Sequence, residues 1–406
     1  MHLRASRALP TLSAVPRHLL FVALAGHGHV TPTLPLVEEL VERGHRVDYA
    51  TEAEFGDAVA AAGARWVPLP PLEPFVPPAQ VGPDLIAFWF RHYFRAMRAT
   101  FPVLREHCRA SPPNGICYDV TNWPARLVAR ELGVPAVRCI PNVAENESYS
   151  LDEQMTAGLA PDHPEMVALA VDCARFSAEF GVELDVAGTM NVTEALNLVF
   201  LPRAFQPAGE TFDDRFHFLG PLLGRREQRE PWAPPDPARP LLYISLGTIF
   251  TDQPEFYRTC LDAFGGGPWQ VAMTVGGVDP AALGPIPPGV EVRARFPQPA
   301  VLRHASAFVS HAGMGSTMEA LHYGVPLITF PQMPEQVANA DRVVELGLGE
   351  RLDTDRLTPG TLAEVAARVA ADPRIRANLD RMRRAIADGG GAARGAELIE
   401  EHLRPA

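Results

Sequence analysis

Short apolar runs alternate with segments of helical periodicity along most of the chain. In the first half, the predicted strands are 18–25, 46–50, 115–120 and 136–140, and the predicted helices are 34–43, 55–62 and 124–132. Strands that are separated by helices pair in parallel through crossover connections. The first half therefore predicts an α/β, doubly wound sheet.

The same alternation restarts after a Pro-rich stretch at 221–240. The second series predicts strands at 241–245, 270–274, 290–293, 307–310 and 327–330, with late helices at 361–372 and 375–388 and a last helix after Gly389 that ends near His402. Residues 68–100 and 145–190 break the rhythm and predict insertions, the second mostly helical. The division expected is an extension (1–17), a Rossmann-like domain (18–220), a linker (221–240), a second Rossmann-like domain (241–388) and a C-terminal helix (389–406).

Composition narrows the classes of function. The chain has 406 residues and a net charge of −12, which makes nucleic acid a poor partner. Its five cysteines are scattered without a CxxC pair, so neither a disulfide framework nor a zinc site is expected and a reducing cytoplasm fits. No apolar run is long enough to span a membrane, and Pro10, Pro16 and Arg17 break any signal-peptide pattern.

A Gly-rich turn joins the strand predicted at 307–310 to a following helix. Unpaired backbone N–H groups and the helix dipole favour an anion at such a helix start. His311 and Ser316-Thr317 can donate to phosphate, and Glu319 suits a ribose diol. Glu335-Gln336 follow the next strand and can bond to sugar hydroxyls. Together they predict a site for a nucleotide diphosphate that carries a sugar.

These residues resemble the donor-sugar signature of family 1 glycosyltransferases. The matching positions are Pro297-Gln298, His311, Gly313, Ser316, Glu319 and Glu335-Gln336, and the resemblance is closest to bacterial macrolide and natural-product glucosyltransferases. It implies two Rossmann-like domains facing across a cleft (GT-B) and a final helix that crosses back to the first domain. It also implies metal-independent, inverting transfer of a hexose to a hydrophobic natural product, in antibiotic biosynthesis or resistance, with a nucleotide sugar and no further cofactor.

A histidine after the first strand is the candidate base. The chain reads Gly26-His27-Gly28-His29 there, and an imidazole can take a proton from a hydroxyl near neutral pH. The family's spacing, three residues before a Pro that opens the first helix, selects His29 over His27. Asp119 ends the strand at 115–120 and matches the family's supporting acid. The alternatives are a metal pair or a capping histidine, and a capping role for Asp119, for which Asn122 is better placed.

The resemblance assigns further donor and acceptor contacts. The donor set is Ser245, Gly247, Thr248, Phe296 (through its backbone), Gln298, His311, Gly313, Gly315, Ser316, Thr317, Glu319, Glu335 and Gln336. Two positions depart from the family pattern, because Arg295 stands where many members have an aromatic residue and Gly315 where plant members have Asn. Phe88, Trp89, Tyr93, Asn142 and Glu145 are the candidate acceptor contacts, although the aromatic residues also suit a helix core.

Several other functions are alternatives to that of a glucosyltransferase. An epimerase of the same fold, a silent binding protein and a transferase using a TDP-deoxysugar all need a similar donor site. A dinucleotide oxidoreductase would need a third glycine after His29. The Glu335-Gln336 pair favours UDP-glucose, because a deoxysugar would leave polar groups unpaired. Asp353-Thr354-Asp355 predicts a helix cap and no metal site. A monomer or a homodimer is expected.

Overall fold

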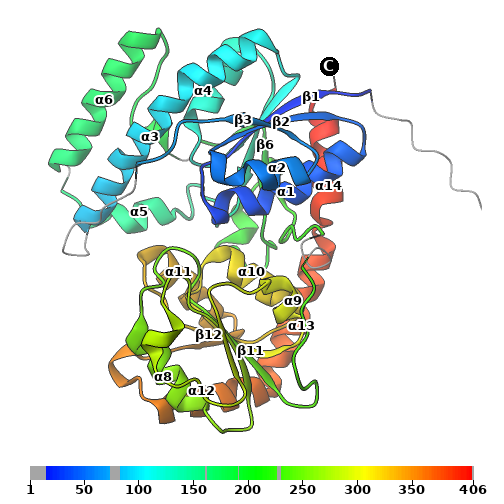
Figure 1. The fold of residues 1–406 in the computed structure, drawn as a ribbon. Coiled ribbons are helices and arrows are strands. Elements are labelled where there is room, and N and C mark those ends of the chain that lie inside the picture. Colours follow the sequence, from blue (N-terminus) through cyan, green and yellow to red (C-terminus); the bar gives the residue numbers. More distant parts are fainter. Residues whose placement is uncertain (1–14, 74–82, 161, 191, 226–229, 405–406) are drawn as a thin grey trace, which may run out of the picture.

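The computed structural model describes residues 15–73, 83–160, 162–190, 192–225 and 230–404, and the strands within them form two parallel sheets (Figure 1). The first sheet has the order β3-β2-β1-β4-β5-β6-β7. Its strands are β1 His18–Val22, β2 Arg46–Thr51, β3 Arg65–Pro68, β4 Gly115–Asp119, β5 Ala136–Ile140, β6 Leu196–Val199 and β7 Phe216–Phe218. Because β1 and β4 are neighbours, the residues that follow them meet at the carboxyl edge, where doubly wound sheets bind ligands.

Helices cover both faces of the first sheet. They include α1 His27–Glu42, α2 Gly56–Ala61, α3 Pro83–Ala110 and α4 Trp123–Leu132, and α5 Leu151–Thr156 and α6 Pro164–Phe180 pack against α3. One apolar core contains Leu36 and Leu40 of α1, and the other contains Phe94 of α3 and Phe176 of α6. The strands are almost entirely buried because both faces are covered, which explains their continuous apolar runs.

The second sheet repeats this architecture with the order β10-β9-β8-β11-β12-β13. Its strands are β8 Leu241–Ser245, β9 Gln270–Thr274, β10 Val290–Arg293, β11 Ala305–Ser310, β12 Leu327–Thr329 and β13 Gly349–Arg351. Its helices are α8 Pro254–Phe264, α9 Gln298–Leu302, α10 Met314–Tyr323, α11 Pro334–Glu345, α12 Pro359–Ala371 and α13 Pro373–Asp388. The α/β, doubly wound class predicted for both halves is confirmed.

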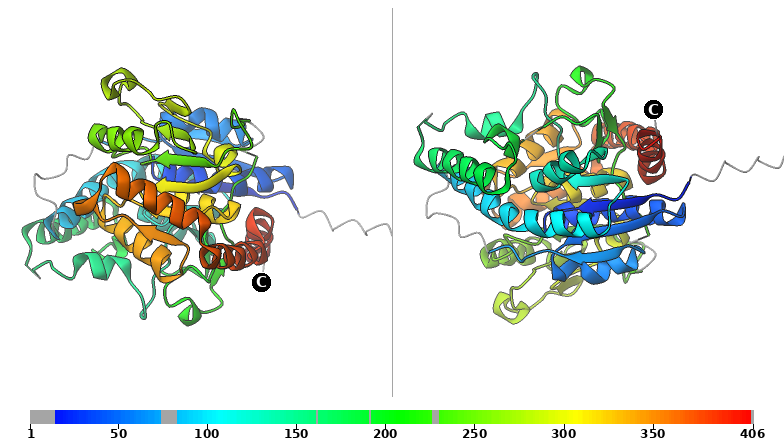
Figure 2. Two further views of the ribbon diagram at one scale, coloured as in Figure 1. Left: turned by 90° about the horizontal axis from the view of Figure 1, so that it is seen from below. Right: turned by 90° about the horizontal axis from the view of Figure 1, so that it is seen from above.

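The last helix returns to the first sheet. After α13 the chain turns at Gly389-Gly390, where a Cβ on Gly389 would lie 2.6 Å from the backbone of Leu219. Helix α14 (Gly391–His402) then packs on α1, with Ile399 fully buried in the core that contains Leu36. Both views of Figure 2 show α13 and α14 (red) along one side of the molecule.

Some element boundaries differ from the prediction. Helix α1 begins at His27, not at Leu34, so Pro32 lies inside the helix and does not open it. The strands β3, β6, β7 and β13 were not predicted, because they are short and carry Arg65, Asn197 or Glu350 in place of an apolar run. Among the described residues, no helix combines the length and the apolar character that crossing a bilayer requires.

Candidate active site

His29 and Asp119 meet at the carboxyl edge of the first sheet. His29 is the third residue of α1, and Asp119 is the last residue of the neighbouring strand β4. The Nδ1 atom of His29 lies 2.8 Å from Oδ2 of Asp119. The carboxylate is fully buried, whereas the imidazole is 29% exposed. The bond occupies Nδ1, so Nε2 is the ring nitrogen left to accept a proton.

Thr121 holds the other oxygen of the carboxylate. Its backbone N–H and its hydroxyl donate to Oδ1 of Asp119 at 3.1 and 2.7 Å. The sequence analysis did not identify Thr121, although the Asp-x-Thr spacing is typical of such local turns. Asn122 stands at the N-cap position of α4, but its side chain makes no capping bond, so the capping role predicted for it is wrong. The carboxylate of Asp119 is engaged by His29 and Thr121.

The dyad favours the charged forms of both groups. Burial of the His29 imidazole lowers its pKa, but the charge and hydrogen bond of Asp119, with a further contribution from Glu335, outweigh burial and raise the pKa overall. Burial raises the pKa of Asp119, but the charge and hydrogen bond of His29 and the bonds from Thr121 lower it overall. Asp119 is therefore an anion at neutral pH and an acceptor for the Nδ1–H of His29.

His311 lies at the turn between β11 and α10, packed between two glycines. A Cβ on Gly247 would lie 2.6 Å from its Nε2 atom, and a Cβ on Gly313 would lie closer still. Burial lowers the pKa of His311 to about 4, although a hydrogen bond to the backbone of Ser245 opposes that shift, so the ring is neutral at pH 7 and carries a single N–H. The N-cap residue Gly313 offers no side-chain cap, which leaves the first N–H groups of α10 for an anion.

Three predicted nucleoside contacts lie together beside this turn. Gln298 begins α9, and its Nε2 donates to Oγ of Ser316 at 3.1 Å and to Oε2 of Glu319 at 2.8 Å. The side chain of Phe296 is buried and makes a T-shaped contact with Trp232, and its predicted backbone contact to the base stays a prediction.

The remaining donor-set residues differ in exposure. Ser245 ends β8 and its Oγ accepts weakly from the N–H of Gly247 at 3.4 Å. Thr248 and Gly315 are exposed. Thr317 is fully buried, and its hydroxyl has no hydrogen-bond partner among the described residues. An oxygen atom of a bound nucleotide sugar that reached this hydroxyl would give it a hydrogen-bond partner.

Glu335 lies in the first turn of α11 and faces the dyad across the gap between the sheets. Burial raises the pKa of its carboxyl group, while the charge of His29 and hydrogen bonds from Asn339 and Asn142 oppose that shift. Asn339 also donates to the carbonyl of Ala312 at 3.0 Å. Ala312 holds a left-handed conformation (φ 61°) in the phosphate turn, so Asn339 ties that turn to Glu335. Sequence reasoning missed Asn339, whose position four residues after Glu335 was the available signal.

Gln336 supports a neighbouring loop. Its side-chain oxygen accepts from the backbone N–H of Gln332 at 2.8 Å, and the amide of Gln253 donates to Gln332 at 3.2 Å. These bonds connect α11 to the segment that follows β8.

The predicted acceptor residues divide into two groups. Tyr93 packs edge-to-face on Trp89 at 5.0 Å, and its pKa is raised by burial and by the charges of Asp119 and Glu335. Both rings therefore lie near the dyad, and Phe88 is 40% exposed on the same helix. Glu145 instead accepts from Oγ of Ser150 and the N–H of Asp152, so its carboxylate orders its own loop.

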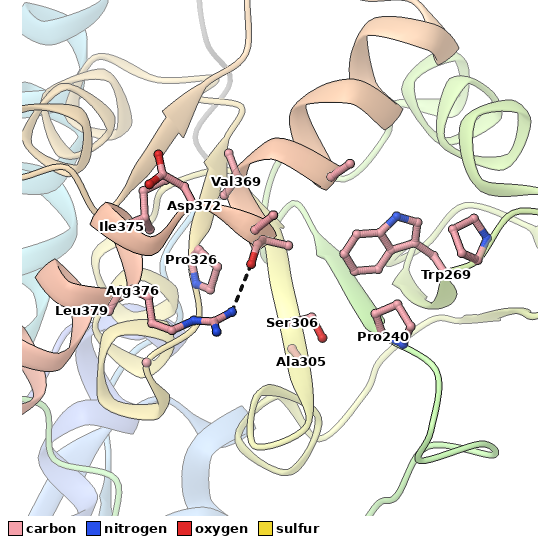
Figure 3. A pocket seen from close by; sticks show the side chains of 15 residues that line it. Pro240, Trp269, Ala305, Ser306, Pro326, Val369, Asp372, Ile375, Arg376 and Leu379 are labelled. Atoms are coloured by element: carbon pink, nitrogen blue, oxygen red, sulfur yellow. Dashed lines mark hydrogen bonds between the residues drawn. The ribbon is translucent and has the colours of Figure 1, made fainter.

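Two other features lie away from the dyad. Asp353 caps a 3-10 turn, accepting from the N–H of Asp355 at 3.1 Å, which confirms its predicted capping role. A groove of about 570 Å³ lies at the amino edge of the second sheet, beside Pro240 and Pro326, which precede β8 and β12 (Figure 3). Ligands of such sheets bind at the carboxyl edge, so this groove is separate from the site.

Comparisons with known proteins agree with this arrangement. Residues 260–393 match the family described as Erythromycin biosynthesis protein CIII-like, C-terminal domain. The chain is 37% identical to the demethyllactenocin mycarosyltransferase of Streptomyces fradiae, covering 96% of this chain and 87% of that protein. It is also 37% identical to the NDP-glycosyltransferase YjiC of Bacillus subtilis, covering 95% and 97%. The crystal structure of the calicheamicin glycosyltransferase CalG4 superposes with a TM-score of 0.83 at 40% identity, covering 96% and 98%.

Proposed function

The chain belongs to the GT-B glycosyltransferases of the natural-product and macrolide type, which are inverting and metal-independent, and we propose that it transfers glucose from UDP-glucose to a hydroxyl group of a hydrophobic acceptor. The observation that supports this most is the pair His29–Asp119 lying opposite Glu335 and the phosphate turn. The epimerase alternative has no support from the relatives, which are named as glycosyltransferases.

In this proposal, each half of the molecule binds one of the two substrates. The first domain (18–220) holds the acceptor beside Trp89 and Tyr93, and the second (241–388) holds the nucleotide sugar. The diphosphate lies at the N-terminus of α10, where it accepts from His311 and from backbone N–H groups. The ribose bonds to Glu319, and the base lies beside Gln298. Ser245, Gly247 and Thr248 lie on the neighbouring loop after β8, where Gly247 approaches His311, and Glu335-Gln336 at the start of α11 take the sugar.

The chemical step is a single displacement. Nε2 of His29 takes the proton of the acceptor hydroxyl as its oxygen attacks the anomeric carbon of the sugar. Asp119 stabilises the imidazolium that forms. The bond from the anomeric carbon to the diphosphate breaks, and the phosphate turn stabilises the charge that develops on the leaving nucleotide. An α-linked donor gives a β-glycoside, and the proton leaves His29 to solvent.

The choice of glucose rests on the polar groups at the sugar end. The carboxylate of Glu335 accepts from Asn339 and Asn142 and has further lone pairs for sugar hydroxyls, and the side-chain nitrogen of Gln336 can donate to one, since its oxygen already accepts from Gln332. A deoxygenated sugar would forgo these additional bonds in a site that excludes water. A TDP-deoxysugar is the second candidate, because one relative is named as a mycarosyltransferase.

Location and partners follow from the substrates. All five cysteines are free and buried, which suits the reducing cytoplasm where nucleotide sugars are made. Only small-molecule partners are required, and the enzyme would act as a monomer or a homodimer.

The test is a donor panel offered to the wild-type protein. UDP-glucose, UDP-galactose and a TDP-deoxysugar are each incubated with macrolide, polyketide and flavonoid alcohols, and products are identified by mass spectrometry and by NMR of the anomeric proton. We expect a β-glucoside from UDP-glucose. Products from the TDP-deoxysugar alone would reject the glucose assignment, and an α-glycoside would reject the displacement.

A further inference from the structure

Arg342 joins the helix that carries Glu335 to the first half of the molecule. It lies on α11, seven residues after Glu335, which is two helical turns and places both side chains on one face. Its Nε atom donates to the carbonyl of Phe205 at 2.8 Å, and Nη2 donates to the carbonyls of Ala204 and Gln206 at 3.3 and 3.2 Å. These three carbonyls belong to the segment between β6 and β7 of the first sheet.

The segment held by Arg342 is itself bonded to the acceptor loop. The side-chain amide of Gln206 accepts from the N–H of Ala144 at 2.8 Å and donates to its carbonyl at 2.9 Å. Gln206 is 1% exposed, so both bonds are shielded from water. Ala144 follows Asn142 by two residues in the loop after β5. Movement of the segment 204–206 would therefore move the loop that carries Asn142.

The side chain of Asn142 also hydrogen-bonds to Glu335 at the start of α11. Helix α11 is therefore connected to the acceptor loop at two places. Near its start Glu335 bonds to Asn142, and two turns later Arg342 bonds to the segment of Gln206, which holds Ala144 of the same loop. A rigid helix therefore meets the acceptor side at two points on one face. One point alone would leave the helix free to tilt, whereas two points about 10 Å apart along the helix axis restrict that tilt.

Arginine suits this position chemically. Its planar guanidinium presents several N–H donors in a fixed fork, while lysine offers one compact ammonium group. The side chain of Arg342 is 16% exposed, and its Nη1 atom pairs with Glu345 at 2.8 Å. A charged donor shared among three carbonyls makes bonds stronger than neutral ones, and a lysine could not span all three.

We propose that Arg342 is a positioning residue that fixes α11, and with it Glu335, against the acceptor loop and the dyad. The inference rests on the proposed function, since it names what aligns the donor sugar with His29. Arg342 touches neither substrate. Its loss would misalign the two halves while leaving the phosphate turn of the second sheet intact.

Three variants test this: Arg342→Ala, Arg342→Lys and the control Arg368→Ala. Arg368 is a half-exposed arginine of α12 that pairs with Glu350 of β13, within the second half of the molecule. Calorimetry gives the Kd for UDP, steady-state assays give kcat and KM for the acceptor, and small-angle scattering with UDP gives the radius of gyration.

For Arg342→Ala we expect kcat/KM for the acceptor to fall about 10-fold or more, because charged hydrogen bonds across the interface are lost. The Kd for UDP should stay within about 2-fold of wild type, since the turn that binds it is intact. The radius of gyration should increase, Arg342→Lys should recover only part of the loss, and Arg368→Ala should match wild type.

Two results would overturn the proposal. One is an acceptor kcat/KM in Arg342→Ala equal to that of Arg368→Ala. The other is a parallel loss of UDP affinity, which would mean that Arg342 merely stabilises its own helix. If the wild-type protein transfers no sugar, the proposed function fails separately. The scattering comparison then decides, and an unchanged radius of gyration rejects the positioning role.

Discussion

The imidazole of His29 must be neutral to accept a proton. Its pKa therefore sets the acidic limb of the pH–rate profile, the range in which the rate falls as the pH decreases. Burial lowers that pKa, but Asp119 outweighs burial and raises it above the ordinary value of 6.5. We expect log(kcat/KM) to rise with pH through the folded-state pKa and then level off. In Asp119→Asn the limb should move to lower pH, because the stabilising charge is gone. A pH–rate profile checks this, and an unmoved limb would contradict the electrostatic coupling.

Protonation of His29, which lowers the reaction rate, raises the stability of the folded protein. A pKa raised by folding means that the native state holds the proton more tightly than the unfolded chain. The His29–Asp119 ion pair therefore contributes its full stabilisation below pH 6.5, and this contribution is lost as pH rises through the folded pKa. Urea unfolding of the wild-type protein and of His29→Gln at several pH values should show a difference that shrinks on going from pH 6 to pH 9. A difference that grows with pH would be the wrong sign.

Gly313 is required by the ring of His311. A Cβ there would lie closer to Nε2 than any ordinary contact allows, and would push the imidazole out of the phosphate turn. We expect Gly313→Ala to weaken UDP binding about 10-fold or more, with loss of a buried hydrogen bond to the diphosphate. Gly277→Ala is the matched control, because a Cβ there meets nothing within 4 Å. Equal UDP affinities by calorimetry in the two variants would show that the turn can relax.

At the scale of elements, the last helix is a structural part of the first half. Ile399 of α14 is fully buried against α1. We expect Ile399→Ala to destabilise the protein by about 2–5 kcal/mol, the usual range for a core truncation. Glu401→Ala on the exposed side of α14 should change stability by less than about 1 kcal/mol. Chemical denaturation measures both, and similar values for the two would mean that α14 contributes little to that core.

Strands were predictable where burial on both faces required a continuous apolar run. Leu241–Ser245 is of this kind and matches the prediction, and Ala136–Ile140 matches it as well although it carries the buried Arg138. Strands β13 and β7 have only three residues each, and their backbone pairing is decided by neighbours already in the sheet. The start of α1 was misplaced because Pro32 indicated a helix start, although the packing of the segment keeps it helical from His27.

At the scale of the whole molecule, the sequence predicted which residues lie on each side of a cleft. It indicated neither how far apart they lie nor what joins them. The contact between His29 and Asp119 was expected because the family resemblance places a supporting acid at a strand end on the same edge as His29, and the pairing of β1 with β4 brings the two together. Arg342 was not identified, since a polar residue on an amphipathic helix has no sequence mark that separates an interdomain contact from a solvated face. Asn339 was missed although its spacing from Glu335 places both residues on one face of the helix.

The central claim is that His29 acts in the chemical step and has no part in holding the nucleotide. Comparing His29→Ala with the wild-type protein, by transfer rate from UDP-glucose and by Kd for UDP, tests it most directly. We predict a fall of about 100-fold or more in transfer, with nucleotide affinity within about 2-fold. Transfer near the wild-type rate, or nucleotide affinity lost in step with transfer, would contradict the role of His29 as the base.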